Sequence, residues 1–253
     1  MAIWNDPQPT GYGASPGPTS GIAGMASARG VTMDTGLRRY MLSIYNYMAS
    51  GVLLSGGVAL GFYQSGMAAQ LFTHGGGLAW LVMLAPLAFV LVMSFGLNKL
   101  STAALQATYW AYCAVMGLSL SMVLLVFTGA SVASTFFATA AAFAGLSLVG
   151  YTTKKDLSGM GSFFLMALFG LIAASIVNMF MHSSGLSFGI SVMGTLIFAG
   201  LVAYDTQRLK AMYYQVGGTG QLAGKMAVMG ALSLYLDFVN LFQFLLSFMG
   251  DRR

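Results

Sequence analysis

The chain contains no glutamate, and its six acidic residues are all aspartates. Charged residues make up only 7% of the 253 residues, whereas a soluble domain carries roughly a quarter. Hydrophobic residues make up 57%. A chain with so little charge has too little polar surface to dissolve, so the composition excludes an ordinary soluble protein.

Metal-binding and thiol residues are equally scarce. The single cysteine, Cys113, excludes an intramolecular disulfide and a thiolate metal site. His74 and His182 fall in separate predicted loops, whereas a zinc hydrolase needs three clustered ligands. The glycines at 75–77 have no lysine after them, so they form no phosphate-binding loop. We expect no resident cofactor, and the isoelectric point of about 9.4 requires no nucleic-acid partner.

The sequence does contain seven apolar segments, each close to the roughly 20 residues that cross a bilayer. Backbone groups in lipid must be satisfied within the segment, and these segments lack the period-two alternation of porin strands, so we expect helices. The predicted fold class is therefore all-α, a polytopic membrane protein with a seven-transmembrane-helix bundle. The segments are residues 40–62, 78–97, 103–127, 130–151, 161–181, 186–204 and 226–249.

Positive charges occur only in alternate loops, which predicts a cytoplasmic N-terminus. Seven crossings would place the C-terminal Asp251, Arg252 and Arg253 outside, against this rule, so the last segment either crosses or re-enters; its length favours crossing. The positive residues are Arg29, Arg38 and Arg39 before the first segment, Lys99 after the second, Lys154 and Lys155 after the fourth, and Arg208, Lys210 and Lys225 after the sixth.

Residues 1–36 differ in composition from the rest of the chain. They are rich in Gly, Pro, Ser and Thr, which predicts a disordered cytoplasmic tail, and they lack the apolar core of a signal peptide. Residues 37–253 form the predicted transmembrane domain.

Asp205 and Asp237 are the two carboxylates that lie in or at the edge of an apolar segment. An ionised carboxylate in hydrocarbon is costly, so each is a functional-site candidate. If the sixth helix continues past Tyr204 toward Arg208, the two can meet in the cytoplasmic half of the membrane. Two carboxyl groups attract when they share a proton and repel when both ionise, which would make a pH-sensitive latch.

A simpler interpretation of Asp205 is an ordinary interfacial carboxylate paired with Arg208 three residues on. Asp237 resists that interpretation because no basic residue lies one turn away on its helix. Ser233 and Asn240, one turn to either side, would give its helix face a polar stripe suited to ion or proton contacts.

Three sequence blocks resemble the signatures of the transmembrane Bax inhibitor motif family, most of all its bacterial members. They are GYTTKKDLSG at 150–159, GLVAYDTQRLK at 200–210 and ALSLYLDFVNLFQFLLSFMG at 231–250. The resemblance covers residues 37–253. It implies a seven-helix fold in which the last helix is central and surrounded by the others.

The resemblance also implies a pH-regulated calcium leak whose sensor is an aspartate pair, matched here by Asp205 and Asp237. In some members an arginine at the inner end of helix two latches the first aspartate, and Lys99 takes that place here. Lysine supplies the charge but not the bidentate geometry of arginine. Bacterial relatives are also implicated in binding a membrane-bound quality-control protease.

The leading hypothesis is a pH-gated calcium (cation) leak channel of the bacterial inner membrane, with no catalytic residues and calcium as a transported ligand at Asp205 and Asp237. The alternative is a regulatory protein that binds a membrane protease and uses the aspartate pair as a structural lock. An intramembrane aspartyl enzyme is chemically permissible but disfavoured, because neither aspartate adjoins a glycine.

Overall fold

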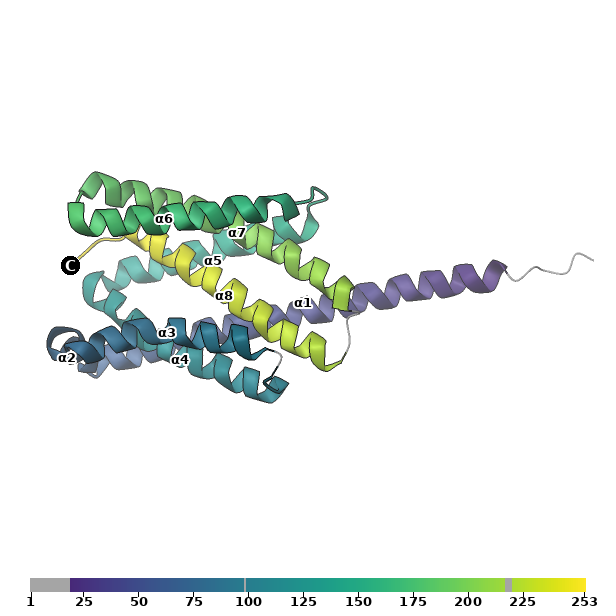
Figure 1. Ribbon diagram of the computed structural model, residues 1–253, viewed down its shortest axis with the longest axis horizontal. Helices are drawn as coiled ribbons and strands as arrows, with labels where there is room; N and C mark the ends of the chain where they lie inside the picture. Colours follow the sequence, from purple (N-terminus) through teal and green to yellow (C-terminus); the bar gives the residue numbers. More distant parts are fainter. Residues whose placement is uncertain (1–18, 98, 217–219) are drawn as a thin grey trace, which may run out of the picture. The chain divides into compact units, whose positions relative to one another are not determined.

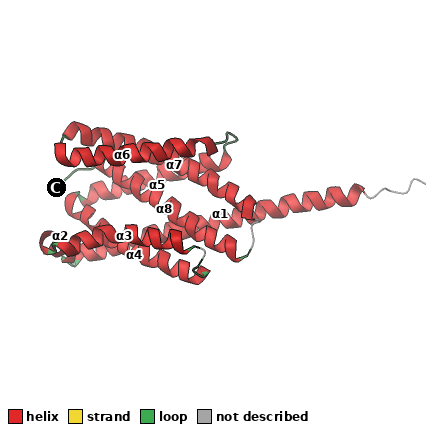
Figure 2. Ribbon diagram, in the orientation of Figure 1, coloured by secondary structure: helices red, strands yellow, loops and turns green. Residues whose placement is uncertain are grey.

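The computed structural model describes residues 19–97, 99–216 and 220–253, and this part of the chain is helical throughout its regular structure (Figure 2). Its helices are α1 (Thr19–Gln64), α2 (Met67–His74), α3 (Gly77–Gly96), α4 (Thr102–Val126), α5 (Gly129–Thr152), the 3₁₀ helix η1 (Ser158–Met160), α6 (Gly161–Met181), α7 (Ser184–Val216) and α8 (Gln221–Met249).

The chain divides after Gly36 into a short N-terminal unit and the unit Leu37–Arg253. Of the predicted disordered tail, residues 1–18 lie outside the described residues. Helix α1 begins at Thr19, within the range 1–36 for which a disordered tail is predicted. Residues 19–36 contain no proline, the residue that a helix interior tolerates least.

Six described helices are long and apolar enough to cross a membrane, and a seventh span results if a broken pair counts as one. The broken pair is Thr35–Gln64 with Met67–His74, bent by 79°. Gly66 stands at the break with a φ of 74°, a conformation that glycine adopts without strain. The predicted polytopic α-helical membrane protein is confirmed.

Local sequence signals explain where two spans begin. Ser101 caps α4, because its hydroxyl accepts the N–H of Ala104 at 3.2 Å. Thr128 caps α5 in the same way, accepting the N–H of Ser131 at 3.3 Å. Each hydroxyl satisfies a backbone donor that the first helical turn leaves free.

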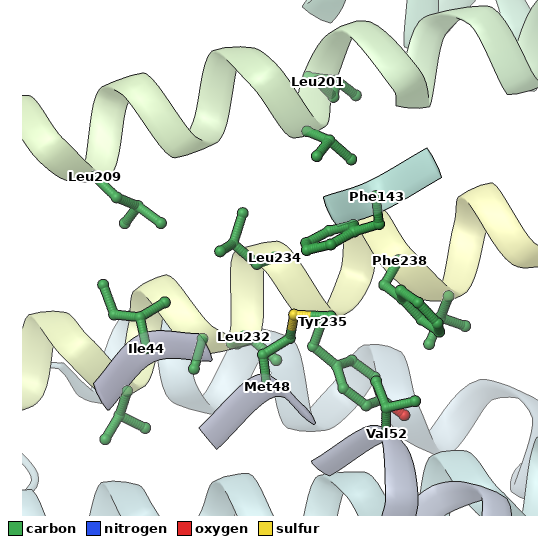
Figure 3. Close-up of a cluster of buried hydrophobic side chains, with 14 of the residues drawn as sticks. Ile44, Met48, Val52, Phe143, Leu201, Leu209, Leu232, Leu234, Tyr235 and Phe238 are labelled. Carbon is green, nitrogen blue, oxygen red and sulfur yellow. The ribbon is translucent and has the colours of Figure 1, made fainter. Parts of the chain in front are cut away.

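The last helix is central, as the sequence resemblance implied. α8 packs against α4, α5 and α7, and half of its apolar window is buried, whereas only 11% of the corresponding window of α6 is buried (Figure 1). Figure 3 shows Tyr235 and Phe238 of α8 among buried side chains of α1 and α5. The Tyr235 hydroxyl also lies 2.6 Å from Ser55 Oγ of α1, an interhelical hydrogen bond that stabilises packing in lipid.

α5 and α7 approach each other closely near the predicted acidic site. A Cβ on Gly150 would collide with the backbone of Ala203, so only glycine allows this contact. One turn away, Ser147 Oγ hydrogen-bonds Thr206 Oγ1 at 3.0 Å. These contacts fix the turn of α7 that carries Asp205.

Most of the basic residues gather at one end of the bundle, here called the basic end, where the α3–α4 and α5–α6 connections and the start of α8 lie (Figure 1). Lys225 Nζ of α8 donates to the Leu97 carbonyl at 3.2 Å. Lys210 Nζ of α7 donates to the Tyr151 carbonyl at 2.9 Å. These bonds tie α8 to the end of α3 and α7 to the end of α5.

The C-terminal end of α8 lies at the opposite end of the bundle. The Asp251 N–H donates to Ser131 Oγ at 2.8 Å, and the Thr128 N–H donates to the Asp251 carbonyl at 3.0 Å. At 1.5 Å per residue the 29 residues of α8 extend about 43 Å, more than the roughly 30 Å hydrocarbon core. α8 is therefore long enough to cross the membrane, as its length in the sequence led us to expect.

Candidate functional site

The structure brings Asp205 and Asp237 together. α7 continues beyond Tyr204 to Val216, as the predicted approach requires, and it carries Asp205 to the face of α8 that bears Asp237. The two residues are only 8% and 5% exposed, and both line one cavity between α6, α7 and α8. A carboxylate without a proton only accepts, so two such carboxyl groups can hydrogen-bond each other only by sharing a proton.

Asp205 has two further partners. Ser233 Oγ donates to Asp205 Oδ2 at 2.9 Å, and Arg208 Nη1 lies 3.8 Å from Asp205 Oδ1. The Arg208 side chain is 53% exposed, so solvent or headgroups screen this ion pair. The simple pairing with Arg208 and the approach to Asp237 therefore exist side by side.

Asp237 is less well satisfied. Its Oδ2 is buried and has no hydrogen-bond partner among the described residues. A buried polar atom without a partner is costly, and such atoms in native structures mark a functional group or a site for water or an ion. Asp237 can therefore hold a proton, a water molecule or a cation.

Both aspartates line a cavity of about 810 Å³ between α6, α7 and α8, here called the acidic groove. Its apolar lining includes Leu165 and Met166 of α6, which are 57% and 65% exposed. The remaining lining residues are Ser158, Gly161, Ser162, Phe164, Leu168, Phe198, Leu201, Tyr204, Arg208, Ser233, Leu236 and Asn240.

A smaller cavity of about 260 Å³ lies at the basic end and shares Ser158, Tyr204 and Arg208 with the acidic groove. Asp156 also lines it. The Ser158 backbone N–H donates to Asp156 Oδ1 at 2.9 Å, and this bond, together with the Ser158 hydroxyl, holds the pKa of Asp156 below its ordinary value. A carboxylate therefore stays ionised beside the mouth of the groove.

Gln207 fixes the loop that forms this mouth. Its Oε1 accepts the N–H of Leu157 at 2.7 Å, and its Nε2 donates to the Lys155 carbonyl at 2.8 Å. One side chain on α7 thereby holds the α5–α6 connection, so movement of α7 would also move the mouth.

The other predicted residues divide into two groups. Asn240 lines the groove and donates from Nδ2 to the Leu236 carbonyl at 2.8 Å. Lys99 is exposed in the turn after α3, and the ion-pair partner that the described residues provide for Asp205 is Arg208.

The part of the chain that is described holds no cluster of three or more His, Cys, Asp or Glu suited to a metal. A calcium ion here would rely on the aspartate pair, neutral oxygens and water.

Sequence reasoning missed the aromatic walls of the groove, Phe164, Phe198 and Tyr204, and the carboxylate at its mouth, Asp156. An aromatic residue in an apolar segment gives no signal that separates groove from core. Asp156 follows two lysines in a loop, where a charge is expected without any special role.

Comparison with known proteins identifies the family. Residues 37–253 match the family described as "Inhibitor of apoptosis-promoting Bax1". The chain belongs to this Bax1 inhibitor family. The match spans the same residues as the resemblance carried by the three sequence blocks, which is therefore confirmed.

Relatives in the Bax1 inhibitor family cover nearly the whole chain. A protein of Caulobacter vibrioides is 48% identical over 233 residues, covering 88% of this chain and 92% of that protein. A protein of Rickettsia prowazekii is 44% identical over 227 residues, covering 90% and 95%. "Inner membrane protein YbhL" of Escherichia coli strain K12 is 44% identical over 223 residues, covering 86% and 94%.

Proposed function

We propose that this protein is a pH-gated leak for cations, with calcium as its cargo, in a bacterial inner membrane. The observation that carries the proposal is the buried pair Asp205 and Asp237, which lines the acidic groove. The Oδ2 atom of Asp237 has no hydrogen-bond partner among the described residues. The printed name of the Escherichia coli relative supports the inner membrane as the location.

The gating step follows from the chemistry of the pair. At low pH one proton bridges Asp205 and Asp237 and holds α7 against α8. At high pH both carboxyl groups ionise, and two neighbouring negative charges repel each other. Their separation would widen the groove and free both carboxylates to hold a cation.

Polar residues continue along α8 beyond the pair. Asn240 lines the acidic groove and, together with the apolar Leu236, also lines a second cavity of about 600 Å³ between α3, α4 and α8. Gln243, one turn further, lines that second cavity. Because Asn240 borders both cavities, it supports a route that passes from one side of α8 to the other.

Calcium fits the oxygen chemistry of this surface. Hard divalent cations prefer carboxylate, amide and hydroxyl oxygens, which Asp205, Asp237, Asn240 and Ser233 supply. A site with few protein ligands leaves several positions to water, which suits passage better than tight storage.

Calcium flux through the purified protein tests the proposal. In liposomes loaded with a calcium-sensitive dye, we expect uptake above that of protein-free liposomes, rising as pH increases from 6 to 8. Pure lipid contains no protease or other partner, so a protein that acts only by binding one would give no flux. Absence of flux at every pH would refute the leak.

The proposed orientation places the N-terminus and the basic end in the cytoplasm. In a Cys113→Ala background, a single cysteine at Lys155 should react with a membrane-impermeant thiol reagent only after cells are opened. A cysteine at His182, in the turn between α6 and α7, should react in intact spheroplasts. Labelling of both from the same side would overturn this arrangement.

A further inference from the structure

We infer that the acidic groove binds lipophilic organic cations that enter it from the bilayer. The ligand class is a singly charged ammonium or phosphonium with a bulky apolar body. The inference concerns equilibrium binding, so it holds or fails independently of any leak.

Charge in the groove favours a cation. Asp205, Asp237, Arg208 and Tyr204 are the charged or titratable residues that line it. Arg208 lies 3.8 Å from Asp205 at the exposed edge, while Asp237 Oδ2 is buried without a described partner. Once the proton shared by the pair is lost, one carboxylate is therefore left for a positive charge from outside the protein.

The walls favour an apolar body around that charge. The volume of about 810 Å³ lies within the roughly 300–1,000 Å³ typical of small-molecule pockets. The rings of Phe164 and Tyr204 pack together with centroids 5.9 Å apart, and Phe198 lines the same groove. Aromatic faces attract organic cations, and the attraction grows where water is excluded.

The rim shows where such a ligand would enter. Leu165 and Met166 of α6 line the groove and are also more than half exposed, within a helix apolar enough to span the membrane. Exposed side chains of such a helix face lipid. A hydrated metal ion would enter through the polar mouth at the basic end, whereas a lipophilic cation is already concentrated in the bilayer.

Binding of radiolabelled tetraphenylphosphonium to the full chain in phosphatidylcholine nanodiscs tests the inference, with empty nanodiscs as the background. We expect saturable binding that weakens at least tenfold in Asp237→Asn, since removing one partner of a buried charge interaction is costly. Asp251→Asn, the same substitution at the opposite end of the bundle, should bind like wild type. Wild-type binding should also weaken on acidification, because protons compete with the ligand for the carboxyl pair.

Two further measurements keep the test decisive if Asp237→Asn folds poorly. Leu165→Trp, at an exposed position, should narrow the groove and weaken binding without disturbing the core. Tetraphenylmethane, a neutral ligand of similar shape, should not displace the cation. The inference would be overturned by binding no greater than to empty nanodiscs, by wild-type binding in well-folded Asp237→Asn, or by no effect of Leu165→Trp. Equal displacement by the neutral compound would also overturn it and would indicate a site for lipid chains.

Discussion

Asp237→Asn should abolish the pH dependence of calcium flux and hold the protein in its low-pH state. Asparagine has nearly the shape of aspartic acid but does not titrate, and its amide can donate to Asp205 as the shared proton does. The repulsion that would open the pair then never develops. We expect flux at pH 8 to fall about tenfold, to the level of wild type at pH 6, which corresponds to about 1.4 kcal/mol.

Liposome flux across pH measures this effect, and Asp251→Asn is the matched control. Asp251 contacts the α4–α5 corner through its backbone N–H and carbonyl, so this substitution preserves those bonds and leaves the acidic groove untouched. It should keep the wild-type profile. If Asp237→Asn kept that profile as well, Asp237 would not be the pH sensor.

The membrane fold was predictable because lipid imposes a simple length and polarity requirement on each span. The bend between α1 and α2 could not be predicted, since it depends on the backbone conformation of Gly66. The chain has 33 glycines, and the sequence does not distinguish Gly66 from the others. Composition alone also does not reveal where α1 begins, at Thr19, because no residue pattern marks a helix that continues outward from a span.

The acidic site was partly predictable for a similar reason. A carboxylate in an apolar segment stands out, and Asp237 has no base one turn away, so a partner on another helix was the natural expectation. The shape of the groove was not accessible, since it depends on which sides of α6 and α7 turn toward α8. Phe164 and Phe198 look like any other core aromatic in the sequence.

The C-terminal charges, which oppose the predicted topology, have a local structural explanation. Arg253 Nη1 donates to the Tyr63 hydroxyl at 2.6 Å, and the Arg252 guanidinium lies 5.8 Å from the Phe127 ring centroid. The Arg253 N–H donates to the Val126 carbonyl at 3.0 Å. The final residues are thus tied to the α4–α5 corner, and such short terminal charges need not set the orientation of the bundle.

Asp205→Asn and Asp237→Asn should also be non-additive in their effects on gating. Carboxyl groups that share a proton interact by more than about one pK unit, so either substitution alone already removes their mutual repulsion. The double variant should therefore change the free energy of gating by about the same amount as the larger single effect, not by the sum.

A double-mutant cycle on the pH midpoint and amplitude of calcium flux measures this coupling. Arg208→Gln combined with Asp237→Asn provides the comparison, because Arg208 contacts Asp205 at the exposed edge of the groove. We expect a coupling between Arg208 and Asp237 smaller than the coupling between the two aspartates, since solvent screens the half-exposed guanidinium. Strictly additive effects of the two aspartate substitutions would mean that each carboxyl group acts alone, and the shared-proton latch would then have to be abandoned.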